Sequence, residues 1–188
     1  MNVTEMFRDP SFYANLRHEI LPKLRTSPFI RIWIAGCATG EEAYSLAILL
    51  QEENLLHKSL IYGTDINPSV LEQAKKAVIP MANLKSYVEN YQLSGGKADF
   101  SAYYSANYNW VKLNSTLRER IVFASHNLVS DASFNAFQLI LCRNVLIYFD
   151  TQLQARVLSL FDESLETFGY LALGSQETLR FSALAHRY

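Results

Sequence analysis

The chain has 188 residues, of which 49% are hydrophobic and 19% are charged. This is enough apolar material for one domain with a single core. The 17 basic and 18 acidic side chains leave a formal net charge of −1. The sequence therefore carries no overall positive field that would hold nucleic acid or an anionic membrane, and partners must be selected by local sites.

The cysteines and the N-terminus limit the compartment. Cys37 and Cys142 lie far apart and have no CxxC or histidine-rich spacing, so they suggest neither a zinc site nor a disulfide framework. Residues 1–12 include acids and lack an apolar signal core, and no apolar stretch approaches the roughly 20 residues of a membrane span. We expect a cytoplasmic monomer that binds no metal and does not insert into a membrane.

The first part of the chain reads as helix, strand and helix. Apolar residues at helical spacing predict a helix from Pro10 to about Leu24. Residues 31–36 form a short run of β-branched, apolar and aromatic side chains, which is typical of a buried strand. The segment from residue 41 is rich in helix formers. The unit is therefore strand, turn and helix.

The same unit then repeats. Residues 59–65 predict a second strand that ends in an acid, Asn67 suits the cap of the next helix, and Pro68 suits its first position. Residues 79–119 give a weaker pattern with many aromatic side chains and a glycine pair. We expect a small inserted subdomain there.

The remaining elements again alternate. They are a strand from residue 120, a strand at 138–144, a helix at 151–168 and a strand at 169–175. Such alternation implies a parallel α/β sheet with helices on both faces, which binds ligands outside the carboxyl ends of its strands. Polar or glycine-bearing segments follow the first four predicted strands, so these segments should converge on one face.

The segments after the first two strands favour a nucleoside ligand. Gly36 and Gly40 permit close backbone approach at a helix N-terminus, but the acids that follow depart from the GxGxxG pattern and would repel a pyrophosphate. Asp65 stands where an acid commonly accepts hydrogen bonds from ribose hydroxyls; alternatively, it caps the following turn. S-adenosylmethionine would fit both features, because it contains an adenosine for Asp65 and a positively charged sulfur that the acids of the loop would not repel.

One polar pair interrupts an apolar run. Residues 139–150 read LILCRNVLIYFD, with Arg143 and Asn144 in the middle. A buried charge costs several kcal/mol unless it is paired. We therefore expect polar partners for this pair.

Four stretches resemble the CheR-type chemotaxis receptor methyltransferases, which methylate glutamate side chains of chemoreceptors. The stretches are NVTEMFRDPSF at 2–12, AGCATGEEAYSLA at 35–47, YGTDINPSVLEQAK at 62–75, and HNLVSD with LILCRNVLIYFD within 126–150. The resemblance implies a Rossmann-like (class I) S-adenosylmethionine-dependent methyltransferase sheet with a small inserted antiparallel β-subdomain. It also answers the question of the Arg-Asn pair, which would mark a strand's carboxyl end turned into the site.

The resemblance also implies roles for individual residues. Arg8 and Tyr148 would act in catalysis, Arg8 by holding the acceptor carboxylate or the cofactor and Tyr148 near the transferred methyl. The implied cofactor contacts are Asn2, Thr4, Arg8, Gly36, Glu41 or Glu42, Asp65, Ile66, Asn127, Leu128, Arg143 and Asn144. S-adenosylhomocysteine would be the product.

The implied function is methyl transfer to glutamate carboxylates of a chemoreceptor or another signalling protein. Two alternatives remain open: a non-catalytic cofactor-binding scaffold, and a methyltransferase for another carboxylate or another protein side chain. Relative to the family pattern, we expect the N-terminal helical domain and the final strands to be absent from these 188 residues. The middle stretch resembles relatives that occur within larger signalling proteins.

Overall fold

A computed structural model of the chain describes residues 4–179 and residue 185. Its centre is a five-stranded sheet in the order β6-β2-β1-β7-β8, in which every pair of neighbours is parallel. The strands are β1 (Ile30–Ala35), β2 (Ser59–Asp65), β6 (Ile121–Ser125), β7 (Phe137–Cys142) and β8 (Leu165–Leu173). The order changes direction between β1 and β7, which is where sheets of this kind bind ligands.

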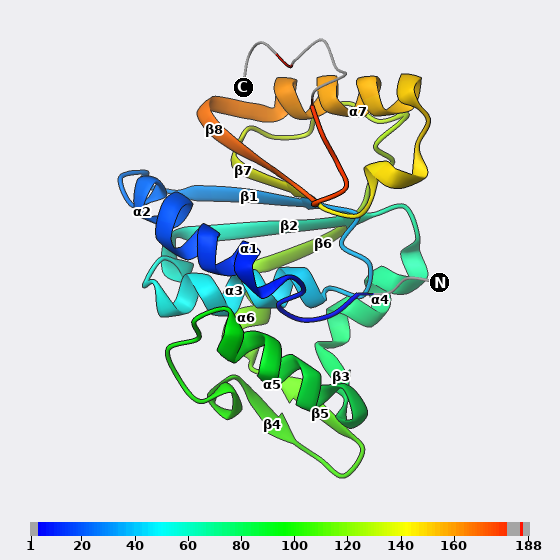
Figure 1. The fold of residues 1–188 in the computed structure, drawn as a ribbon. Helices are drawn as coiled ribbons and strands as arrows, with labels where there is room; N and C mark the ends of the chain where they lie inside the picture. Colours follow the sequence, from blue (N-terminus) through cyan, green and yellow to red (C-terminus); the bar gives the residue numbers. More distant parts are fainter. Residues whose placement is uncertain (1–3, 180–184, 186–188) are drawn as a thin grey trace.

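Side chains of the central strands alternate between two cores. Ile32 and Ile34 of β1 belong to the larger core, whereas Trp33 and Ala35 belong to the smaller one. Figure 1 shows α7 on one side of the sheet and α3 on the other. The predicted α/β sheet with helices on both faces is therefore confirmed.

The helices that precede or connect the strands flank the sheet. They are α1 (Pro10–Asn15), a π-helical turn (Leu16–Ile20), α2 (Leu21–Leu24), α3 (Glu41–Glu52), α4 (Pro68–Lys76), α6 (Ser115–Arg118) and α7 (Thr151–Ser164), with short 3-10 turns at Leu56–Lys58 and Leu146–Tyr148. As expected, Asn67 caps α4, because its side chain accepts a hydrogen bond from the Ser69 amide.

A small antiparallel sheet lies apart from the main one, at the bottom of Figure 1. Its order is β3-β5-β4, with β3 (Val78–Pro80), β4 (Tyr104–Ala106) and β5 (Trp110–Leu113). The helix α5 (Leu84–Leu93) and 3-10 turns at Met81–Asn83 and Phe100–Tyr103 complete this part. The sequence predicted the antiparallel unit but not α5, whose buried Tyr87 and Tyr91 face the larger core.

The predicted boundary between α7 and β8 was wrong. The helix was expected to reach Phe168, but it ends at Ser164, and Leu165 already pairs with Phe137 in the sheet. The pairing then shifts register, and Phe168, with φ 65° and 91% of its surface exposed, lies in this irregular part of β8. Strand pairing overrides the helical propensity of this segment.

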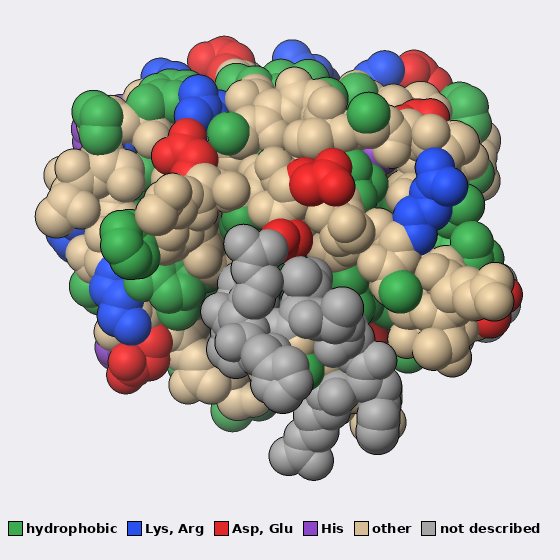
Figure 2. Space-filling view, turned by 90° about the horizontal axis from the view of Figure 1, so that it is seen from above, with side chains coloured by type: hydrophobic (Ala, Val, Ile, Leu, Met, Phe, Trp, Pro, Cys, Tyr) green, Lys and Arg blue, Asp and Glu red, His purple; other side chains and the backbone are tan. Residues whose placement is uncertain are grey.

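The surface charge is mixed. Figure 2, seen from above Figure 1, shows basic and acidic side chains interspersed on that face rather than gathered into a patch of one sign. No helix in the described part of the chain combines the length and apolarity needed to cross a membrane.

Candidate functional site

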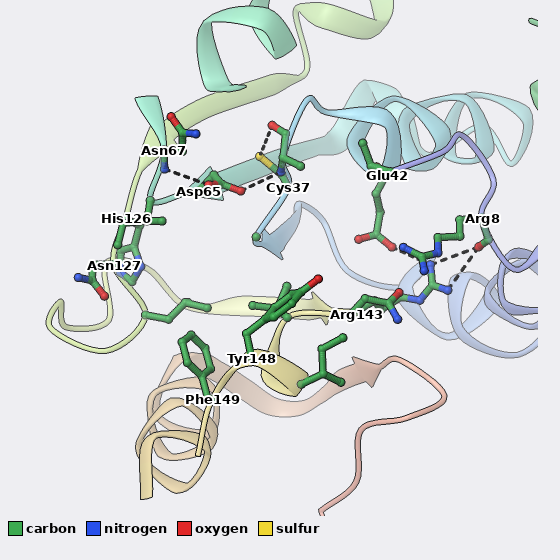
Figure 3. A pocket seen from close by; sticks show the side chains of 18 of the residues that line it. Arg8, Cys37, Glu42, Asp65, Asn67, His126, Asn127, Arg143, Tyr148 and Phe149 are labelled. Atoms are coloured by element: carbon green, nitrogen blue, oxygen red, sulfur yellow. Dashed lines mark hydrogen bonds and ion pairs between the residues drawn. The ribbon is translucent and has the colours of Figure 1, made fainter. Parts of the chain in front are cut away.

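A cavity of about 700 Å³ opens at the carboxyl ends of the strands. As predicted, the segments that follow β1, β2, β6 and β7 converge there, together with the N-terminal segment and the start of α3 (Figure 3). The lining residues are Thr4, Glu5, Arg8, Tyr13, Gly36, Cys37, Ala38, Glu42, Asp65, Ile66, Asn67, His126, Asn127, Leu128, Val129, Arg143, Asn144, Val145, Ile147, Tyr148 and Phe149.

The glycine loop after β1 allows two loops to meet closely. Gly36 has φ +76°, and a Cβ there would lie only 2.4 Å from Cγ2 of Val145. An alanine would therefore be strained by its backbone and would collide with the loop after β7. Gly40, with φ +92°, precedes the first residue of α3.

Asp65 ends β2 at the cavity wall, and it serves the local turn as well. One carboxylate oxygen accepts a hydrogen bond from the Ala38 amide at 3.0 Å, and the other accepts one from the Asn67 amide at 2.9 Å. Each oxygen retains a second lone pair. The capping role and the ribose role that the sequence left as alternatives are therefore compatible in this geometry.

Arg143 follows β7 directly and has polar partners, as its sequence context required. Its guanidinium, 4% exposed, pairs with Asp9 at 2.5 Å and with Glu42 at 2.9 Å, and it donates to the Arg8 carbonyl at 3.3 Å. It also lies 4.0 Å from the centre of the Phe12 ring. Arg143 thus ties the N-terminal segment to α3 at the cavity wall.

The two acids at the start of α3 differ in position. Glu42 lines the cavity, whereas Glu41 does not and instead accepts a hydrogen bond from the Thr39 hydroxyl at 2.6 Å. Burial raises the pKa of Glu42, and the nearby Arg143 charge only partly offsets this. Of the two acids between which the sequence left the choice, the geometry thus favours Glu42 as the cavity carboxylate.

The N-terminal segment brings Thr4 and Arg8 to the cavity, as expected. Asn2 lies outside the described residues. Asn127 also lines the cavity, and its side-chain oxygen accepts a hydrogen bond from the Val129 amide at 2.9 Å, which shapes the loop after β6. Leu128 and Ile66 add apolar surface, with Leu128 8% and Ile66 66% exposed.

Tyr148 stands at the rim of the cavity. It is the last residue of the 3-10 turn Leu146–Tyr148 and is 77% exposed. Figure 3 shows its ring projecting between the Asp65 side and the Arg143 side of the cavity. Tyr148 is therefore accessible to a ligand rather than packed in a core.

Tyr13 is a cavity residue that the sequence analysis missed. Its ring is fully buried, and its hydroxyl has no hydrogen-bond partner among the described residues. The hydroxyl of Ser45 accepts a hydrogen bond from the Phe7 amide and donates its own to the Glu41 carbonyl, so it has no proton to offer Tyr13. Burial raises the pKa of Tyr13, so it stays protonated and can donate. The helical spacing from Pro10 to about Leu24 did not single out this position.

Comparison with known proteins agrees with this architecture. Residues 2–186 match the family model "CheR methyltransferase, SAM binding domain", in which SAM denotes S-adenosylmethionine. Among solved structures, the glycopeptide N-methyltransferase MtfA complexed with sinefungin is similar, with a TM-score of 0.53 at 10% identity over 91% of this chain and 50% of that one. This second likeness bears on the fold alone.

Curated relatives include "Putative methyltransferase Cher3" of Pseudomonas putida, which is 52% identical over 99% of this chain and 68% of its own length. A "Chemotaxis protein methyltransferase" of Borreliella burgdorferi is 33% identical over 95% of this chain and 65% of its own. A 104.1 kDa protein of Rhodobacter capsulatus is 33% identical over 99% of this chain but only 20% of its own length. The chain thus spans about two thirds of the first two relatives and a fifth of the third. It belongs to the CheR methyltransferase family, as an S-adenosylmethionine-binding domain of that family.

Proposed function

We propose that this domain transfers the methyl group of S-adenosylmethionine to a glutamate side-chain carboxylate of a chemoreceptor or a related signalling protein. The observation that carries the proposal is the cavity itself. It places Asp65, which can accept hydrogen bonds from a ribose, at one end, the pair of buried Arg143 and half-buried Glu42 at the other, and the exposed Tyr148 at the mouth. The names of the chemotaxis relatives support the choice of acceptor.

The cavity residues suit the cofactor chemically. Asp65 retains lone pairs for ribose hydroxyls, Gly36 lets Val145 of the loop after β7 close against the cavity wall, and the carboxylate of Glu42 suits an ammonium group. When bound, the cofactor supplies an activated methyl group on a positive sulfur.

The residues have little acid or base chemistry to perform. A glutamate carboxylate is already a nucleophile: its oxygen would form a bond to the methyl carbon as the sulfur–carbon bond broke, which would leave a methyl ester and a neutral thioether. Positioning should therefore dominate, and good alignment can supply roughly 7–11 kcal/mol. Arg8 would hold the acceptor carboxylate, because a guanidinium matches a carboxylate in fixed geometry. Tyr148 would align the acceptor at the mouth.

Calorimetric titration with S-adenosylhomocysteine tests the cofactor site. Asp65→Ala should weaken binding by about 1–3 kcal/mol, which is the usual loss when a buried hydrogen-bond partner is removed. Glu89→Ala, at an exposed position of α5, is the matched control and should bind like the wild type. Equal affinities for the wild type and Asp65→Ala would remove Asp65 from the site.

Transfer of labelled methyl groups to a chemoreceptor cytoplasmic fragment tests the acceptor. The expected product is a methyl ester, which releases methanol in mild base; a base-stable product would indicate another side chain. Tyr148→Phe and Arg8→Ala should lose turnover while S-adenosylhomocysteine still binds to Tyr148→Phe. A wild type that binds the cofactor but labels no protein would favour the scaffold alternative.

A further inference from the structure

One carboxylate collects four backbone amides at the end of the sheet. The side chain of Glu177 accepts hydrogen bonds from the amides of Asn144 at 3.0 Å, of Val145 and Leu146 at 2.8 Å, and of Gly174 at 2.6 Å. Hydrogen bonds to an ionised acceptor are about twice as strong as neutral ones. Glu177 lies outside the motifs that the sequence analysis singled out.

Three of the four donors belong to the loop that follows β7. This loop begins at Asn144, whose φ of 59° is unusual for a residue with a side chain, and it continues into the 3-10 turn that ends at Tyr148. The amides at the start of such a turn have no partner within the turn. The Glu177 carboxylate therefore satisfies the donors that this backbone path would otherwise leave unpaired.

The segment after β8 is shaped to deliver this carboxylate. The Glu177 amide donates to the Gly174 carbonyl at 3.0 Å, which closes a tight turn. A Cβ at Gly174 would lie 2.5 Å from a Glu177 carboxylate oxygen and 3.0 Å from the Asn144 nitrogen. Only a glycine leaves space for the side chain to reach the neighbouring loop.

The loop held in this way forms much of one cavity wall. Asn144, Val145, Ile147 and Tyr148 all line the cavity, and Val145 packs against the position of Gly36. A shift of the loop would therefore move the side chains at the rim and the wall opposite the glycine loop together.

We propose that Glu177 is a positioning residue: its carboxylate fixes the loop that carries Asn144 and Tyr148 to the cavity, without contacting the ligand itself. This inference rests on the proposed function, because it assigns Glu177 to the geometry of the same site. It also predicts that the site needs an anion bound to the four backbone amides of Asn144, Val145, Leu146 and Gly174.

The test replaces the carboxylate and then supplies it from solution. Glu177→Ala should lower the affinity for S-adenosylhomocysteine at least fivefold and the methyl-transfer kcat at least tenfold. Because formate carries the same carboxylate, roughly 100 mM sodium formate should restore much of both losses, whereas sodium chloride at equal ionic strength should not. Glu177→Gln, which keeps the shape but not the charge, should fall between the alanine variant and the wild type. Gln176→Ala, at the exposed neighbouring position, is the control and should behave like the wild type.

Several results would overturn the proposal. They are a folded Glu177→Ala protein with unchanged affinity and kcat, or losses that formate does not restore more than chloride does. If Glu177→Ala does not fold, Glu177→Gln decides: wild-type affinity and kcat in that variant would reject a need for the anion. Because S-adenosylhomocysteine binding needs no acceptor, this readout stands even if no protein substrate is methylated, so the two proposals can fail separately.

Discussion

Two clusters in this molecule are built on one arginine and two acidic side chains, but they differ in how many hydrogen-bond donors these acids receive. In the closed cluster, Arg17 pairs with Glu52 and Glu53, each at 2.6 Å, and the three side chains are at most 7% exposed. In the open cluster, Arg143 pairs with Glu42 and Asp9, and the Asp9 side chain is 52% exposed. Each cluster therefore holds a buried arginine between two carboxylates, and in the closed cluster Glu53 also pairs with Arg25 and Lys97.

The surroundings of the carboxylates differ. Burial alone would raise the pKa of Glu52, but hydrogen bonds from Tyr91, Arg17 and Tyr103 outweigh it and lower the pKa below its ordinary value. In the open cluster, the pKa of Glu42 stays raised, because burial outweighs the opposing effects of Arg143 and Arg8. The hydroxyl of Tyr13 beside it has no partner among the described residues.

This difference indicates that the closed cluster stabilises the fold, whereas the open cluster is available to bind a ligand. The closed cluster joins the π-helical turn, α3 and the aromatic residues of the small subdomain, and its carboxylates are fully supplied with donors. The open cluster adjoins the cavity: Glu42 accepts a hydrogen bond from Arg143 at 2.9 Å, and the neighbouring Tyr13 hydroxyl has no partner among the described residues. The Nε atoms of Arg17 and Arg143 both lack a partner there, so the difference lies in the carboxylates and the tyrosines. Buried polar groups that lack partners are costly, so their retention at a cavity favours completion by a ligand.

The largest expected effect comes from breaking the closed cluster. Arg17→Met should lower the free energy of unfolding by about 3–5 kcal/mol, because it leaves Glu52 buried without a cation. Denaturant unfolding measures this, with Arg156→Met on the exposed face of α7 as the control. A loss below about 1 kcal/mol would show that the cluster is not structural.

Removing a tyrosine hydroxyl from the closed cluster should have a smaller effect on stability. The Tyr103 hydroxyl donates to Glu52 at 2.9 Å, so Tyr103→Phe should cost about 1.5–3 kcal/mol of stability and leave the affinity for S-adenosylhomocysteine unchanged. Tyr108→Phe, at a position that is 97% exposed, should change neither quantity. A loss of affinity in the Tyr103 variant would contradict the separation of the two clusters.

Removing the tyrosine hydroxyl beside the open cluster should instead lower ligand affinity and leave stability unharmed. Tyr13→Phe removes a buried hydroxyl without a partner, so stability should stay equal or rise, while S-adenosylhomocysteine affinity should fall by about 1 kcal/mol, or roughly fivefold. Unfolding and calorimetry on the same sample give both values. Lower stability with unchanged affinity would mean that the hydroxyl has a structural partner instead.

The smallest expected effect is a pH dependence of binding. Because burial raises the pKa of Glu42, a fraction of the free protein molecules carries this side chain protonated at pH values near and below that pKa. A bound ammonium group would favour the ionised carboxylate, so binding would release protons. Affinity for S-adenosylhomocysteine should therefore rise as pH increases from about 4.5 through the raised pKa, and then level off. Calorimetry in buffers of different ionisation enthalpy should detect release of less than one proton. Glu42→Gln should abolish this release; if the release persists in that variant, another group is responsible.

The strands and their ends could be predicted because the signals are local. Buried parallel strands are continuous apolar runs, and the residues just beyond them, such as Asp65 and Arg143, necessarily meet at one edge. Asn67 and Pro68 likewise mark a helix start through short-range hydrogen bonding.

The missed features all depend on residues distant in sequence. Glu177 meets amides more than thirty positions away, and the role of Tyr13 follows from a hydroxyl whose surroundings come from α3 and β7. The helix α5 buries only Tyr87 and Tyr91, so its apolar periodicity is weak in the sequence and its position depends on the packing of these two tyrosines in the larger core. Composition can mark such side chains as apolar or acidic, but only the packed chain decides what they contact.

The rates at which the two buried thiols are alkylated in the folded protein can measure local opening of the structure around them. Cys37 and Cys142 are each at most 2% exposed, and burial raises the pKa of both, so neither reacts as an accessible thiolate. Alkylation of the folded protein must therefore follow fluctuations that expose them. Cys37 lines the cavity, and Cys142 is the last residue of β7. Their separate labelling rates therefore report how often the cavity wall and the end of the central sheet open.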